Sequence, residues 1–152
     1  MSAFVFYAQE RPESCVPACL RMVLVAYGVD RSETELYICC QTDIDGTLPS
    51  AAAHCAQALG IEAIATRSID LDGLLVHLKI TSASLIAFIN LSPLLGVNVI
   101  HAVIVETIDI EAGQVQVIDP TYPPTGRRRW TLGMFTIGWQ LARRQVILMA
   151  PL

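Results

Sequence analysis

The sequence has few charged residues and little basic character. Charged residues make up only 16% of its 152 residues and hydrophobic residues 53%, which excludes an intrinsically disordered chain. The formal net charge of -4 argues against nucleic acid as the main partner. The single basic run, Arg127 to Arg129, lies among apolar residues, so we interpret it as a solvated strand or loop edge. No repeat or linker interrupts the chain, and residues 1–152 are predicted to form one domain with its own core.

Signals for export or membrane insertion are also lacking. Residues 1–9 have no positively charged segment, and their apolar stretch is too short for an export signal. Residues 80–105 carry no formal charge and are numerous enough to span a membrane. However, Asn90, Pro93, Gly96 and His101 interrupt this segment, and β-branched residues on either side favour strand, loop and strand. We therefore expect no membrane span.

The cysteines show no regular spacing. Their odd number and the missing export signal indicate a reduced, cytoplasmic chain, with cysteines at positions 15, 19, 39, 40 and 55. A zinc site could be imagined from Cys39, Cys40, Cys55 and His54. Adjacent cysteines on a helix point apart, however, and no Cys-x-x-Cys spacing occurs. We expect neither a metal nor a cofactor.

The pattern of elements changes near the middle of the chain. Helices are predicted at residues 15–27, after the Ser32 and Glu35 capping box, before Gly60, and at 71–79, with one short strand at 61–66. Strands then follow at 85–89, 99–108, 114–118, 127–132 and 145–150, with a short helix near 134–141. We predict an α+β fold with an N-terminal helical half and a C-terminal antiparallel sheet half.

Cys15 lies where the first helix begins. Backbone N–H groups are unpaired at a helix start and the helix dipole is positive there, so a thiolate is stabilised. A thiolate nucleophile also needs a histidine that shares its proton and an acceptor that orients the imidazole. Cys19 lies one turn later and is predicted to pack inward, because i, i+4 spacing suits a disulfide poorly.

His101 and Asp119 are the candidates for the other two roles. His54 and His77 lie on predicted helices and are interpreted as partly buried structural residues, whereas His101 opens an apolar strand directly after a loop. Asp119 ends the next strand, so a hairpin turning at residues 111–114 should make His101 and Asp119 near neighbours. The alternative for Asp119 is a turn residue in an Asp-Pro step.

Gln9 precedes Cys15 by six residues. Acyl transfer needs hydrogen-bond donors directed at the oxyanion of the tetrahedral intermediate. The Gln9 amide and the Cys15 backbone N–H could supply two such donors. A solvated loop glutamine is the alternative.

The segments "QERPESCVPACLRMVLVAYG", "HAVIV" and "VIDP" together resemble the double-glycine leader peptidases, papain-like domains at the N-terminus of bacteriocin-exporting transporters. Residues 42–60 also resemble the family's second helical region. The resemblance implies a papain-like cysteine peptidase fold, with Cys15 as nucleophile, His101 as general base, Asp119 as orienting residue and Gln9 as oxyanion donor. The complete set of Cys15, His101 and Asp119 argues against the family's inactive, substrate-docking relatives.

The resemblance further implies a peptide or protein substrate, cut as a leader peptide after a Gly-Gly-type site. A separate ABC transporter is an expected partner, since the membrane and ATPase parts of such transporters do not follow in this sequence and we expect a stand-alone domain. Ser14 and Val16 depart from the family, which commonly has an acidic or amide residue before the cysteine and a glycine after it. The bulkier Val16 is expected to narrow or reshape the site.

Two other functions remain open at this point. One is a non-catalytic module that binds leader peptides for a transporter. The other is related thiol chemistry in an effector-type protease, deamidase or transamidase that acts on another protein, because all of these share the acyl-thioenzyme step.

Overall fold

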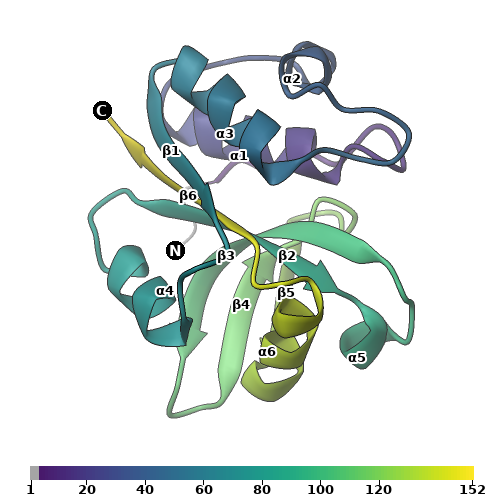
Figure 1. The fold of residues 1–152 in the computed structure, drawn as a ribbon, viewed down its shortest axis with the longest axis vertical. Coiled ribbons are helices and arrows are strands. Elements are labelled where there is room, and N and C mark those ends of the chain that lie inside the picture. The colour runs from purple at the N-terminus through teal and green to yellow at the C-terminus, as the bar shows by residue number, and fades with distance from the viewer. Residues whose placement is uncertain (1–3) are drawn as a thin grey trace.

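A six-stranded antiparallel sheet separates two layers of helices (Figure 1). The computed structural model describes residues 4–152, so the first three residues of the predicted domain and N-terminal segment lie outside the described residues. The strand order is β1-β6-β2-β3-β4-β5. The strands are β1 (Ile61–Thr66), β2 (Ser84–Asn90), β3 (Ile100–Asp109), β4 (Gln114–Ile118), β5 (Arg127–Thr131) and β6 (Val146–Pro151).

The first helical layer contains α1 (Cys15–Ala26), α2 (Glu33–Cys39) and α3 (Pro49–Ala58). Helix α1 is apolar along most of its length and packs against β3, α2 and α3, so most of its residues are buried. Its Leu20 and Leu24 join Ala102 and Ile104 of β3 in one core cluster. This packing places α1 against β3.

The second layer covers the opposite face of the sheet with α4 (Leu71–Leu78), α5 (Ser92–Leu95) and α6 (Leu132–Leu141). Phe135 and Trp139 of α6 are buried in a second core cluster with Val103 and other sheet residues. Gly138 permits the close approach of α6 to β2, since a Cβ atom at this position would lie 2.6 Å from the Asn90 carbonyl oxygen.

The hairpin of β3 and β4 brings the start of one strand beside the end of the other. Ile104 pairs with Ile118, and the register shifts once, between Val105 and Thr107. Strand β5 continues the sheet beyond β4, with Arg128 directly opposite Val117. His101, at the start of β3, and Asp119, just after the end of β4, form the sheet side of the candidate site.

The predicted fold class is confirmed, with two differences in the placement of elements. The structure has three helices after β1, so helices cover both faces of the sheet, and β1 from the first half pairs with β6 at its edge. Residues 92–95, predicted as loop, form the short helix α5, which begins at Ser92-Pro93 and ends at Gly96 in the left-handed region (φ 72°). The uncharged segment 80–105 thus divides among β2, α5 and β3. Within residues 4–152, no helix is long and apolar enough to cross a membrane.

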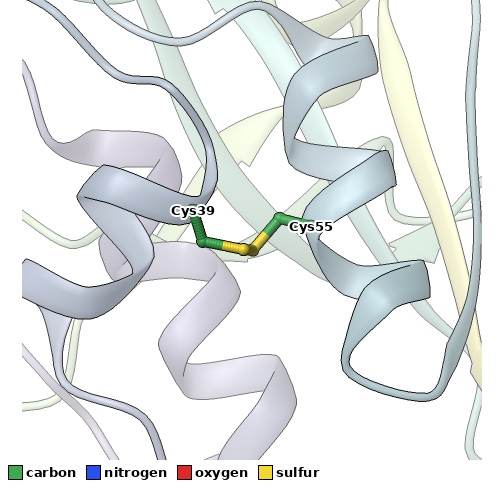
Figure 2. Close-up of a disulfide and its surroundings, with 2 residues drawn as sticks. All are labelled: Cys39 and Cys55. Atoms are coloured by element: carbon green, nitrogen blue, oxygen red, sulfur yellow. A yellow bond between two sulfur atoms is a disulfide. The ribbon is translucent and has the colours of Figure 1, made fainter.

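The prediction of a fully reduced chain is wrong, because Cys39 and Cys55 form a disulfide (Figure 2). It joins the last residue of α2 to the middle of α3, with the two Cα atoms 5.5 Å apart. Sequence spacing does not reveal that these helices pack side by side, so the pair could not be identified from the chain alone. Cys15, Cys19 and Cys40 are free, and Cys40 is buried.

Candidate active site

The loop before Cys15 is held by a buried side-chain network. Ser14 is completely buried; its Oγ accepts a hydrogen bond from the Arg11 N–H at 3.0 Å and donates to Glu33 Oε2 at 2.9 Å. The Glu10 N–H also donates to Glu33, at 3.1 and 3.0 Å from its two carboxylate oxygens. The residue that precedes the thiol is therefore fastened to the first turn of α2.

Glu33 was missed by the sequence analysis. It is only 1% exposed, and its burial raises the pKa of the carboxyl group against the opposing effect of the hydrogen bonds from Glu10 and Ser14. In the sequence Glu33 is one of two glutamates in the first turn of a capped helix, where acidic residues commonly face solvent. The capping box with Ser32 distinguishes Glu35, but no signal in the sequence indicates that Glu33 is buried.

Cys15 begins α1 and is partly accessible, as a reactive thiol must be. Cys19 is fully buried, with its Sγ 3.5 Å from the Ala102 carbonyl oxygen, and the prediction that it packs inward is confirmed. Burial raises the pKa of Cys19 well above its ordinary value. The two thiols on α1 therefore differ in access to solvent.

His101 and Asp119 are in contact, as the predicted hairpin requires. His101 Nε2 lies 2.8 Å from Asp119 Oδ1, and both side chains are buried. Burial opposes charge on the imidazole, but hydrogen bonds to Asp119 and Cys15, together with the charges of both groups, raise the pKa of His101 to about 9. His101 thus contacts Asp119 directly, and its imidazole lines the same cleft as the Cys15 thiol.

The Asp119 carboxylate is held from several sides. Its Oδ1 also accepts hydrogen bonds from the Thr121 N–H at 2.9 Å and the Thr121 hydroxyl at 2.6 Å. Its Oδ2 accepts one from Arg128 Nη1 at 3.3 Å. Burial by itself would raise the pKa of this carboxyl group. The interactions with His101 and Thr121 outweigh burial and lower the pKa to about 2. Asp119 is therefore ionised at neutral pH.

The thiol and imidazole open into a cleft of about 570 Å³. Its walls come from three segments: Pro12 and Glu13 before the helix, residues 44–46 between α2 and α3, and Val99 and Ile100 at the start of β3. Ile44 and Ile100 are well exposed, so two sides of the cleft present apolar surface. This is room for an extended peptide segment.

Gln9 lies beside the site, in a neighbouring hollow that also contains Pro120 and Thr121. Its backbone N–H donates to the Pro120 carbonyl at 3.0 Å, which ties the loop to the segment after Asp119. Its side-chain Nε2 donates to the carbonyl oxygens of Arg11 (2.9 Å) and Pro12 (3.2 Å), and its buried Oε1 has no hydrogen-bond partner among residues 4–152. In this structure the Gln9 amide is engaged by its own loop.

The other two histidines are not part of this arrangement. His54 is exposed on α3, so the prediction that it is partly buried is wrong; it lies on the outer side of that short helix. His77 is half-buried, with Nε2 2.8 Å from the Ser84 carbonyl oxygen, which is consistent with a structural role.

A cysteine at a helix start, in one cleft with a histidine that contacts an aspartate on an adjacent sheet, is the arrangement used for nucleophilic acyl transfer. Together with the arrangement of helices and sheet, these residues place the chain in the papain-like cysteine peptidase fold class. The model of the peptidase C39 family matches residues 3–151, and the chain therefore belongs to that family. Family membership supports assignment as a cysteine peptidase.

Solved structures with the same fold cover nearly the whole chain. The peptidase domain of Streptococcus ComA, a bifunctional ABC transporter involved in a quorum-sensing pathway, is 20% identical, with 96% of this chain and 97% of that chain covered and a TM-score of 0.72. A putative C39-like peptidase from Bacillus anthracis is 13% identical, with 97% and 94% covered and a TM-score of 0.78. A double-glycine motif protease from an AMS/PCAT transporter, solved with a leader peptide, is 17% identical, with 98% and 92% covered and a TM-score of 0.71. No curated protein matches the chain.

Proposed function

We propose that this protein cleaves peptide bonds through a Cys15-His101-Asp119 triad and removes leader peptides after a Gly-Gly-type site. The observation that carries the proposal is the contact of His101 with the buried, ionised Asp119, together with the open cleft that the Cys15 thiol and the His101 imidazole both line. The family supports peptide hydrolysis. Similarity to the double-glycine motif protease solved with a leader peptide supports the substrate class.

The reaction begins with attack of the Cys15 thiolate on the carbonyl carbon of the scissile bond, which forms an S–C bond and a tetrahedral oxyanion. The His101 imidazolium then protonates the leaving nitrogen as the C–N bond breaks. Neutral His101 accepts a proton from water, whose oxygen attacks the thioester. When the C–S bond breaks, the peptide acid and the thiolate are released. Asp119 holds the imidazole in the required tautomer throughout.

The Gln9 amide is the proposed side-chain donor to the oxyanion, together with the Cys15 backbone N–H. In this structure the amide donates to the Arg11 and Pro12 carbonyl groups. It must therefore exchange at least one of these hydrogen bonds for the oxyanion when substrate binds.

The partner proposed for this peptidase is a separate ABC transporter that exports the processed peptide, since structurally similar peptidase domains belong to ABC transporters. The cytoplasmic location remains a prediction made from the sequence. Processing of a bacteriocin precursor is the corresponding biological setting.

The test uses a synthetic precursor peptide with a Gly-Gly site, incubated with the purified chain and followed by mass spectrometry. We expect a single cut after the second glycine, no cut with Cys15→Ala, and retained cleavage with Cys19→Ala as the matched control. Replacing both glycines with valine should prevent the cut. Cleavage by Cys15→Ala at the wild-type rate would contradict the proposed triad. Binding of the peptide without cleavage would indicate a docking module, and a gain of about one dalton in the peptide mass would indicate deamidation.

A further inference from the structure

Arg128 is the middle residue of the basic run that the sequence analysis interpreted as solvated. On β5 the side chains alternate between the two faces of the sheet. Arg127 is 43% exposed and its Nε lies 3.7 Å from Glu106 Oε1. Arg128 is 23% exposed and turns to the face that carries Asp119. Arg128 therefore differs in its surroundings from Arg127.

Strand register determines this difference. Arg128 lies directly opposite Val117, two residues before Asp119, and side chains two residues apart share a face. The Asp119 N–H donates to the Gly126 carbonyl at 2.7 Å, which closes the loop between β4 and β5 and brings Arg128 beside the carboxylate. The guanidinium also lies over the Tyr122 ring, 4.4 Å from its centroid, and 5.9 Å from that of Trp130.

The two oxygens of Asp119 have different partners. Oδ1 is hydrogen-bonded to His101 Nε2 and accepts hydrogen bonds from the N–H and hydroxyl of Thr121. Oδ2 accepts a hydrogen bond from the Arg128 guanidinium. A carboxylate that is 1% exposed is costly to keep charged unless cations or hydrogen bonds compensate the lost hydration. Arg128 supplies a cation on the side away from His101, held in place by Tyr122 and Trp130.

We propose that Arg128 is a positioning residue for the proposed peptidase reaction: it holds Asp119 in the orientation in which Oδ1 aligns His101 with Cys15. This inference rests on the proposed function only for its kinetic readout. Arg128 touches neither the thiol nor the substrate cleft, and it acts through Asp119. Its contribution should therefore be seen in the chemical step and not in substrate binding.

The kinetic experiment compares Arg128→Gln and Arg128→Lys with wild type, and uses Arg127→Gln and Arg129→Gln as matched controls on the same strand. We expect Arg128→Gln to lower kcat by about 10- to 100-fold with little change in KM, because small misplacements of catalytic groups have effects of this size. Arg128→Lys should recover a large part of kcat, since it restores the charge. The controls should stay within about twofold of wild type.

A second readout needs no peptide substrate, and so separates failure of this inference from failure of the proposed function. The rate at which iodoacetamide alkylates Cys15, located by peptide mapping, should fall in Arg128→Gln and recover in Arg128→Lys. If wild type cuts no leader peptide, this comparison still tests Arg128. If Arg128→Gln does not fold, Arg128→Met, which keeps an apolar stem over Tyr122, takes its place. Unchanged kcat and alkylation in the folded variant, or equal losses in the Arg127 and Arg129 controls, would overturn the inference.

Discussion

The two sides of the candidate cleft are held in place by different interactions. On the helical side, Cys15 follows a loop tied to the buried carboxylate of Glu33, and the helices behind it are cross-linked by Cys39 and Cys55. On the sheet side, His101 and Asp119 are aligned by strand register and by charge. Substitutions on the helical side should therefore mainly lower the stability of the fold, whereas substitutions on the sheet side should mainly lower the rate of cleavage.

The largest expected effect is a loss of kcat from a substitution on the sheet side. Asp119→Asn should lower kcat by about 10³- to 10⁴-fold, because an asparagine in this position favours the wrong imidazole tautomer and does not stabilise the imidazolium. The measurement is steady-state cleavage of the precursor peptide. Cleavage within about tenfold of wild type would contradict the assignment of Asp119 as the orienting residue.

The same variant has a second readout in the pH dependence of stability. The pKa of His101 is about 9 in the folded protein and 6.5 ordinarily, so its contribution is fully present below about pH 6.5 and lost as pH rises through 9. Urea unfolding of wild type should show this loss across that window. Asp119→Asn should show a much smaller one, since the carboxylate that favours the imidazolium is gone.

On the helical side, loss of the disulfide should have the next largest effect. The cross-link joins residues separated by 16 positions, and closing a loop of about this length contributes about 3 kcal/mol to the free energy of unfolding. The variant Cys39→Ser with Cys55→Ser should lose this amount in denaturant unfolding, while Cys15 keeps its reactivity at temperatures where the variant is folded. The serine variant should not respond to reductant. If reductant also left the free energy of unfolding of the wild-type protein unchanged, the cross-link would not contribute to stability.

A smaller effect is expected from Glu33→Gln. The amide that replaces one carboxylate oxygen places a donor against the Glu10 N–H or the Ser14 hydroxyl, and an unsatisfied buried group costs about 1–3 kcal/mol. Thermal unfolding measures the loss. The control is Glu35→Gln, an exposed position where glutamine preserves the capping box, with an expected change under about 0.5 kcal/mol. Equal losses in both variants would argue against a special role for the Glu33 carboxylate.

The candidate site was predictable where its signals are local or follow from a short hairpin. Cys15 at a helix start can be recognised from the residues around it, and the contact of His101 with Asp119 follows from two strands joined by a turn. Arg128 and Glu33 could not be predicted in the same way. Each reaches the site from a separate element, and neither an arginine run nor a glutamate in a first helical turn indicates which member is buried.

The sequence by itself determined the α+β class, the bounds of most elements and the placement of Cys15, His101 and Asp119, because periodicity, capping and turn residues act over short stretches of chain. Only the tertiary structure decided the cysteine pairing, the division of the helices between two faces of the sheet, and the separation of Arg128 from Arg127 and Arg129. The physical reason is that these features depend on which elements pack side by side. That packing brings together residues whose distance along the chain carries no information about their contact.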